Sequence, residues 1–226
     1  NTYVINHTHL PTYFPEEDII RSTDGGATWS NCFSSLGYFG GLDEKEGVTY
    51  ITHTSSILKS TGGNFSNLYS VTGSMVGDVS FFNAFTGCVI SNNNSGNNGL
   101  LKTTNGGINW VFIPNQGNKY LYNIELLPSG YGYAAADDSG YFIKTTNFGA
   151  NWQSFNTGIN NYTYNMKFID DNNGWFLYSI NPNSGYRLYF TKNGGLNFYP
   201  VTSLGEFIVK SFSFVNVNTG FVCGDN

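Results

Sequence analysis

Charged residues are scarce in this chain of 226 residues: only 11% are Asp, Glu, Lys or Arg, and the formal net charge is −5. The arginines are limited to Arg21 and Arg187. Proteins that bind nucleic acids use clustered basic side chains that displace counterions from the phosphates. The few lysines here are spread thinly along the chain, so we expect no nucleic-acid partner.

Long apolar runs, cysteines and helix-favouring segments are also few. No apolar run approaches the roughly 18 residues of a membrane-spanning helix, so we expect no membrane insertion. The three cysteines lack the spacing of a metal site, and we predict neither a metal nor a cofactor. Cys88 and Cys223 lie in apolar segments close behind a glycine, which favours buried free thiols over a disulfide.

Aromatic residues, by contrast, make up 17% of the chain, and Asn, Gly, Ser and Thr fill the spaces between short apolar segments. This composition is typical of many short strands joined by turns. The length suffices for one large all-β domain with a sizeable core.

One eight-residue stretch, Ser22 to Trp29 (STDGGATW), recurs along the chain. Full copies span residues 103–110, 145–152 and 191–198, and a shortened copy spans 60–65. Each full copy has a hydroxyl residue, then Asp or Asn, then glycine, and an aromatic three residues after the last glycine. Asp and Asn accept hydrogen bonds from nearby backbone amides, and glycine adopts positive φ without strain. Each copy therefore predicts a hairpin turn, with the aromatic beginning the return strand.

The spacing resembles the Asp-box of sialidases and related propellers, S-x-D-x-G-x-T-W, which residues 22–29 match fully. The later copies have Asn at the Asp position. In Asp-box proteins this turn is a structural corner remote from the active site. The resemblance therefore implies a structural, non-catalytic role for the following residues: Asp24, Trp29, Trp110, Trp152 and Phe198.

A second pattern recurs with the first: an apolar strand, a short polar turn, and a glycine that opens another apolar strand. Its copies are residues 81–87, 126–132, 168–174 and 214–220, and Gly47 is expected to open the equivalent strand of a weaker repeat. A period of roughly 40 to 50 residues with four short strands per unit is typical of a β-propeller, in which neighbouring sheets stack to bury their faces.

We therefore predict a single all-β domain over residues 1–226, a β-propeller of four-stranded antiparallel blades. The predicted repeats are 1–36, 37–78, 79–122, 123–164, 165–209 and a partial one at 210–226. In the third repeat, strands are expected at Val79–Asn83, Gly87–Ser91, Gly99–Thr104 and Asn109–Pro114. The first repeat lacks its first strand, and the last has only its first two. Two interpretations stay open: a ring of about five blades with an extra strand, or a segment of a larger propeller, which we favour.

The pattern F-x-D-x-x-x-G-W at 168–175, taken with the extended box at 143–152, resembles the propeller-type assembly factor of photosystem II and related bacterial BNR-like propellers. The resemblance covers nearly the whole chain, from Ile19 to Asp225. It implies a fold and not a function, because such repeats occur in assembly factors, secreted surface proteins and xyloglucan-active glycosidases.

The loops at the end of the blades opposite the Asp-box turns are the expected binding surface. Tyrosines beside Asn and Asp suit carbohydrate or protein binding, because rings stack while amides form hydrogen bonds. The candidate residues are His7, His9, Tyr13, Tyr120, Asp137, Asp138, Tyr162 and Tyr186. The two histidines lack a third ligand for a metal. The adjacent acids Asp170 and Asp171 are interpreted as turn formers.

The preferred hypothesis is a non-catalytic propeller that presents this surface to a protein partner or a surface glycan. A sialidase is excluded because its family binds the substrate carboxylate with three arginines. A xyloglucanase-like glycoside hydrolase stays open, with Asp137 or Asp138 facing Glu16, Glu17 or Asp18 across a cleft. A structural segment of a large surface or filament protein is a third hypothesis.

Location is inferred from composition. Scarce charge, abundant Asn, Ser, Thr and Tyr, and a start at Asn1 instead of Met lead us to expect a secreted or cell-surface protein whose N-terminus is processed or trimmed. No signal peptide is recognised, and the sequence predicts no particular oligomeric state.

Overall fold

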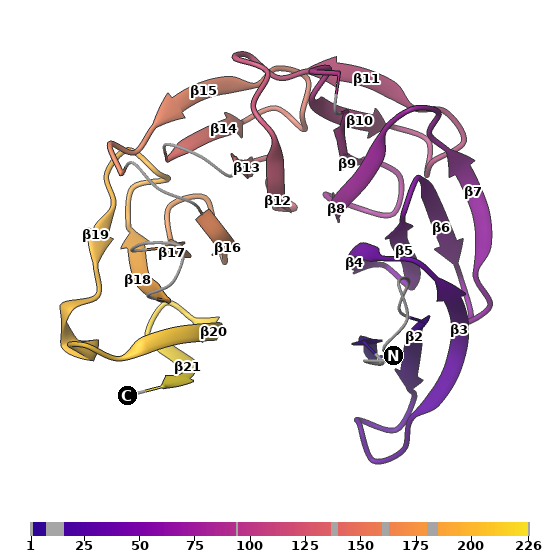
Figure 1. The fold of residues 1–226 in the computed structure, drawn as a ribbon, viewed down its shortest axis with the longest axis horizontal. Coiled ribbons are helices and arrows are strands. Elements are labelled where there is room, and N and C mark those ends of the chain that lie inside the picture. The colour runs from indigo at the N-terminus through magenta and orange to yellow at the C-terminus, as the bar shows by residue number, and fades with distance from the viewer. Residues whose placement is uncertain are drawn as a thin grey trace. The chain divides into compact units, whose positions relative to one another are not determined.

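The chain folds into antiparallel sheets. The computed structural model describes residues 2–7, 16–93, 95–136, 140–159, 163–179 and 185–225. Within these residues all regular structure is β apart from one short 3₁₀ helix, Thr202–Leu204, so the predicted all-β class is confirmed. None of the described helical structure has the length and apolarity needed to cross a bilayer. The chain divides into two compact units, Asn1–Phe112 and Ile113–Asn226. Figure 1 shows the strands of both.

The first unit contains three antiparallel sheets whose strands are adjacent in sequence order. Sheet 1 consists of β1 (Thr2–His7), β2 (Glu16–Ser22) and β3 (Ser30–Leu36). Sheet 2 consists of β4 (Phe39–Lys45), β5 (Val48–His53), β6 (Ser56–Ser60) and β7 (Ser66–Ser70). Sheet 3 consists of β8 (Met75–Phe81), β9 (Gly87–Asn92), β10 (Gly99–Thr103) and β11 (Val111–Pro114).

The second unit repeats the same pattern. Sheet 4 consists of β12 (Leu121–Leu126), β13 (Gly132–Ala136), β14 (Tyr141–Thr145) and β15 (Gln153–Asn156). Sheet 5 consists of β16 (Thr163–Phe168), β17 (Gly174–Ser179), β18 (Tyr186–Thr191) and β19 (Tyr199–Pro200). A terminal hairpin follows, formed by β20 (Ile208–Asn216) and β21 (Thr219–Asp225). Sheets 2 to 5 are the predicted four-stranded antiparallel blades, and the described part of sheet 1 has three strands. The pairing of Tyr186 in β18 with Val209 in β20 joins the terminal hairpin to sheet 5.

The register identifies which strand of the repeat each end supplies. In sheet 3, Gly87 at the start of the second strand faces Thr103, the first residue of the box. In sheet 1, Thr2 of β1 faces Ser22 in the same way. Strand β1 is therefore a second strand, as predicted, and the described part of sheet 1 has no first strand.

The glycine of the second pattern makes room for an aromatic ring. Phe81 faces Gly87 across β8 and β9, and Phe168 faces Gly174 across β16 and β17. In both sheets a Cβ atom added to the glycine would overlap the phenylalanine ring. One face of the ring therefore lies against the glycine, and the other face is available to pack on the preceding sheet. This arrangement explains why phenylalanine and glycine are always six residues apart.

Gly47 directly precedes β5, the second strand of sheet 2, as predicted, but it does not hold the packing place of Gly87. Thr49 faces Ser60, the first residue of the shortened box, so Thr49 is the equivalent of Gly87. Gly47 instead lies in the turn before β5, with φ of 80°. A turn glycine and a packing glycine look alike in a sequence, so the pattern did not distinguish the two roles.

Within each unit the hydrophobic core lies between successive sheets. Phe81 of sheet 3 stacks on Tyr50 of sheet 2, with ring centroids 3.7 Å apart. Phe168 of sheet 5 stacks in the same way on Tyr133 of sheet 4, at 3.6 Å. Since burying an aromatic ring removes a large apolar area from water, these stacks hold neighbouring sheets together.

The burial of the second strands shows which of them are covered by neighbouring sheets. Every residue of β9 is buried, whereas β21 is mostly exposed although it holds the same place in the repeat. Cys88 in β9 is accordingly buried, as predicted, but Cys223 in β21 is exposed, so that prediction is wrong for Cys223. The reason is that the described part of the hairpin has no third strand or following sheet to cover β21.

Candidate binding surface

The candidate residues taken from the sequence are not gathered into one described site. His9, Tyr13, Asp137, Asp138 and Tyr162 lie outside the described residues. The backbone of His7 pairs with Glu17, and its side chain is also outside the described part.

The remaining two candidates can be placed. Tyr120 is half-buried, with its ring 5.3 Å from that of Tyr122. Tyr186 is the first residue of β18, and it packs half-buried against the apolar cluster around Trp175 and Leu177. Their roles in binding stay predictions.

The Asp-box turns are closed by hydrogen bonds among their own residues. The Ser22 hydroxyl accepts a hydrogen bond from the amide of Gly26 at 2.8 Å and donates one to Asp24. Asp24 in turn accepts hydrogen bonds from the amide and the hydroxyl of Thr28 at 2.9 and 2.5 Å. The hydrogen bonds from Thr28 and Ser22 lower the pKa of Asp24 from 3.8 to about 2. The carboxylate is thus engaged within the turn.

The Asn copies form the same turn with one acceptor fewer. In residues 103–110, the Thr103 hydroxyl accepts from the Gly107 amide at 2.9 Å, and the Asn105 side chain accepts from the Asn109 amide at 3.0 Å. The turns beginning at Thr145 and Thr191 repeat these contacts. A carboxamide oxygen therefore replaces the carboxylate. The box aromatics Trp29, Trp110, Trp152 and Phe198 each directly precede the fourth strand of their sheet.

The basic residue before three of the boxes links one sheet to the next. Arg21 donates to the carbonyl of Gly62 at 2.7 Å, and Lys59 donates to that of Gly106 at 3.0 Å. In the second unit, Lys144 donates to the carbonyl of Gly194 at 2.7 Å. Each acceptor is the first glycine of the following box, so these cations join successive turns.

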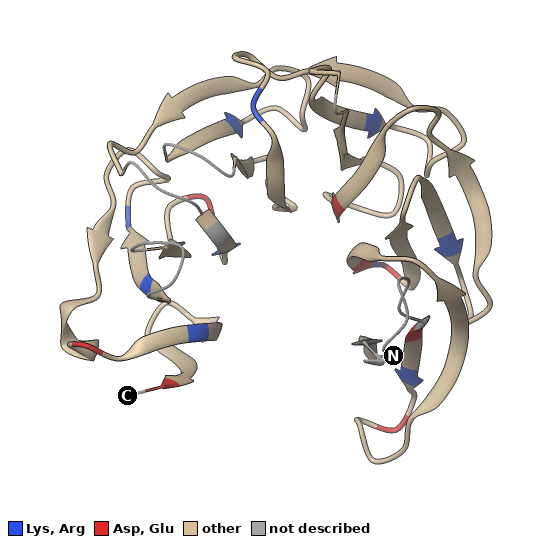
Figure 2. Cartoon of the chain, in the orientation of Figure 1, with Lys and Arg blue, Asp and Glu red and all other residues tan. Residues whose placement is uncertain are grey.

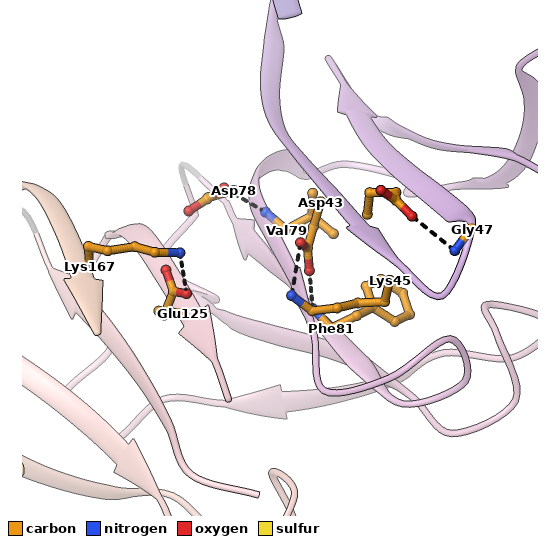
Figure 3. Close-up of polar contacts among 9 residues, drawn as sticks. Asp43, Lys45, Gly47, Asp78, Val79, Phe81, Glu125 and Lys167 are labelled. Atoms are coloured by element: carbon orange, nitrogen blue, oxygen red, sulfur yellow. Dashed lines mark hydrogen bonds and ion pairs between the residues drawn. The ribbon is translucent and has the colours of Figure 1, made fainter. Parts of the chain in front are cut away.

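The carboxylates that the structure describes serve the fold. In the first unit Asp43 accepts from the amide of Phe81 at 2.7 Å and pairs with Lys45 at 3.2 Å (Figure 3). In the second, Glu125 pairs with Lys167 at 2.7 Å (Figure 3). Burial raises the pKa of Asp43 despite these partners. Figure 2 shows the other charged residues both on strands and in turns, and the described residues contain no cluster of His, Cys, Asp and Glu suited to a metal ion.

Of the two acids in the turn after β16, Asp170 is a turn former, as predicted, whereas the Asp171 side chain bonds to the preceding sheet. Asp170 accepts hydrogen bonds from the amides of Asn172 and Asn173 at 2.8 and 2.7 Å, and Asp171 accepts one from the hydroxyl of Ser129. Burial alone would raise the pKa of Asp170, but these hydrogen bonds outweigh it, and the pKa is lowered. Neither acid is free to act as a catalytic pair.

A groove of about 560 Å³ lies in the second unit, between β15 and the box turn of sheet 5. One wall is the edge strand β15, and the other is Gly194, Gly195 and Leu196. Carboxamides are the commonest side chains in the lining, and the side chain of Lys144 is its one ionisable group. The volume falls within the range of small-ligand sites, but a lining that is as polar as it is apolar is unlike that of a typical apolar pocket.

The geometry of Lys144 gives the groove a fixed positive charge. Its ammonium donates to the carbonyl of Gly194 and lies 5.2 Å from the ring centroids of Tyr131 and Tyr133. Burial lowers the pKa of Lys144, and the charge of Asp171 opposes that effect. A ligand that presents hydrogen-bond acceptors or a negative charge at this end is therefore favoured.

The groove was not predicted, because sequence reasoning placed binding in the loops opposite the box turns. The sequence feature that could have indicated the groove is the spacing between the box aromatic and the aromatic of the fourth strand. Phe65 and Tyr69 are four residues apart, whereas Trp152 and Phe155 are three apart. The extra residue in sheet 2 is Leu68, a bulge in β7, and β15 has no counterpart to it.

Comparisons with known proteins agree with this architecture. Residues 20–31 match the sequence model of the BNR/Asp-box repeat. No curated protein sequence matches the chain significantly. A solved structure of YCF48 from Cyanidioschyzon merolae is 18% identical with a TM-score of 0.66, and the match covers 93% of this chain and 77% of that one. The fold is a β-propeller of Asp-box repeats.

Other solved structures are similar to a comparable degree. A structure of YCF48 bound to a D1 peptide is 15% identical with a TM-score of 0.58, and the match covers all of this chain and 94% of that one. A GH74 xyloglucanase from Xanthomonas campestris is 12% identical with a TM-score of 0.72 over 98% of this chain. This chain spans only 42% of that enzyme. At such identities the likeness shows the fold alone.

Proposed function

We propose that this β-propeller is a non-catalytic scaffold that binds a protein partner. The observation that carries the proposal is that every carboxylate whose side chain is described has a hydrogen-bond or ion-pair partner within the fold. A glycosidase needs two carboxylates that face its substrate. The similarity to YCF48, one structure of which is bound to a D1 peptide, supports a protein partner over a small molecule.

The proposal is tested by partner binding measured alongside turnover. The purified chain is cross-linked to proteins of its source, the cross-linked protein is then purified separately, and the two are titrated by calorimetry. We expect saturable binding and no release of reducing ends from xyloglucan. Release of reducing ends at an enzymatic rate would overturn the proposal.

The second candidate is a xyloglucanase-like glycoside hydrolase, favoured by the similarity to the Xanthomonas campestris enzyme. Two of its candidate acids already have structural roles. Glu17 is buried and accepts from the amide of Phe39 at 2.7 Å, while Asp18 accepts from Asn31 and Ser34. Asp137 and Asp138 lie outside the described residues, so the discriminating variants are Asp137→Asn and Asp138→Asn. Any turnover that either variant abolishes would favour the enzyme.

A glycan partner and an exported, cell-surface location stay predictions from composition and fold resemblance. Binding to a glycan array tests the first. Fractionation of the source cells, followed by detection of the chain with an antibody, tests the second.

A further inference from the structure

Strand β15 differs from the other fourth strands in having an unprotected edge. In β3 and β7 the register shifts at Cys32 and Leu68, so each strand carries a bulge. Pro200 lies in β19, and Pro114 ends β11. Bulges and prolines are the usual means by which edge strands avoid pairing with other chains. The register of β15 with β14 is continuous, and β15 contains no proline.

The same missing bulge opens the groove beside that edge. In the first unit Leu68 lies so close to Gly107 that a Cβ atom on this glycine would overlap it, so the leucine covers the box turn of sheet 3. In the second unit the equivalent glycine is Gly195, and the atoms nearest to its Cβ position are the ring edges of Phe155 and Phe198, at 3.3 and 3.4 Å. The space that Leu68 occupies in one unit is therefore open in the other.

The groove presents hydrogen-bonding groups that suit a peptide backbone. Alternate residues of an edge strand direct their N–H and C=O groups away from their partner strand. Asn151 and Gln153 are exposed, and neither carboxamide has a hydrogen-bond partner among the described residues. One face of the Phe155 ring is already stacked on Phe142, with centroids 5.6 Å apart. The strand edge, more than a ring face, is therefore the main recognition element, which favours a peptide over a sugar.

We propose that this groove binds an extended peptide segment of a protein partner, which adds a strand to the edge of β15. The inference rests on the proposed scaffold function and names the site and the form of the ligand. Backbone hydrogen bonds to β15 provide affinity, and the carboxamides select the alignment. The charge of Lys144 favours a neutral or acidic peptide.

The test uses a phage-displayed library of random octapeptides selected on the full chain. The decisive variant inserts a leucine between Ser154 and Phe155, which recreates the bulge of β7. A second variant, Gln153→Lys combined with Asn156→Lys, places charges on the edge without changing the register. The matched control is Asn67→Lys on β7, an exposed edge that already has a bulge. Circular dichroism establishes that each variant is folded.

We expect selected peptides to bind the wild-type chain and the Asn67→Lys control equally, and to lose at least ten-fold in affinity on both β15 variants. Bound peptide should also slow hydrogen exchange at the amides of β15. Equal binding to all variants would overturn the groove as the site while leaving the scaffold function intact. Recovery of no binding peptide would overturn the peptide as its occupant. A glycan-array signal that the insertion abolishes would show that the groove binds saccharides, and would also overturn the proposal of a peptide ligand.

Failure of the scaffold function gives a different result. In that case the cross-linked protein of the preceding experiment shows no saturable binding to the wild-type chain. The comparison of variants therefore tests the groove, and the wild-type titration tests the function.

Discussion

The hydroxyl that begins each Asp-box turn bonds more of the turn's backbone than any other side chain in it. In residues 103–110 the Thr103 hydroxyl accepts hydrogen bonds from the amides of Asn105 and Gly107 and donates one to the Asn105 side chain. It is also buried, so water cannot replace these bonds. A buried amide that loses its acceptor carries the full cost of desolvation.

Thr103→Val therefore tests the turn while keeping its shape. The buried Gly107 amide loses its acceptor, and we expect the free energy of unfolding to fall by about 1–3 kcal/mol. Urea denaturation measures the change. The matched control is Thr104→Val, because Thr104 is exposed and should tolerate the change. Equal losses in the two variants would contradict this role for the hydroxyl.

At the residue scale, Asp24 makes the stability of the folded state depend on pH. Its pKa is lowered from 3.8 to about 2, chiefly by the hydroxyl of Thr28. The folded state thus favours the charged form, so the stabilisation is present above about pH 4 and is lost as the pH falls through 2. We expect the Asp24 carboxyl carbon to titrate near pH 2 by NMR. Thr28→Val should move the midpoint upward, and an unchanged midpoint would contradict the assigned cause.

At the scale of elements, pairs of an aromatic residue and a glycine determine how closely successive sheets approach within a unit. Phe81 occupies the space that a side chain at position 87 would fill, and it stacks on Tyr50 of the preceding sheet. Filling that space would displace the ring from its stack, and overpacked cores lose stability because side chains leave their preferred rotamers.

Gly87→Ala should accordingly lower the free energy of unfolding by about 1–3 kcal/mol. Gly62→Ala is the control, because no atom lies within 4 Å of the added methyl group and Gly62 is not among the residues with positive φ. Thermal unfolding of both variants measures the difference. A Gly87→Ala protein as stable as the control would show that the ring can move without loss.

The strands of the third repeat show what local sequence can determine. The prediction Gly87–Ser91 differs from β9 by one residue, since glycine and an apolar run mark this strand clearly. The first strand begins at Met75 instead of Val79, because Gly77 and a register shift hide its start. The fourth begins at Val111 instead of Asn109, because the Asn109 amide and Trp110 belong to the turn. Tertiary packing and capping, which pattern alone does not contain, decided these two boundaries.

For the whole molecule, the repeat predicted the fold but not the groove. The period shows in the sequence because each repeat needs the same turn and the same glycine. The groove depends on whether the fourth strand has one residue more or fewer, as Leu68 in β7 illustrates. A difference of one residue in the fourth strand alters no motif, although it is visible in the spacing from Trp152 to Phe155.

Protection from hydrogen exchange should vary across the molecule with burial. Strands β9 and β13 are buried throughout, whereas β21 is mostly exposed. Because protection reports local opening, we expect the amides of β9 and β13 to exchange slowest among the second strands and those of β21 fastest. Exchange detected by mass spectrometry on peptic fragments measures the order. Similar protection of β21 and β9 would mean that another surface covers β21 in solution.

The hydrogen bonds that close each Asp-box turn all fall within eight consecutive residues, from Ser22 to Trp29 in the first copy. A gene segment that encodes one repeat therefore encodes all the residues needed to close its Asp-box turn. Duplication can lengthen such a protein, and the strands between corners can diverge freely, provided that their apolar faces still match. The solved structures that share this architecture are fewer than one residue in five identical to this chain.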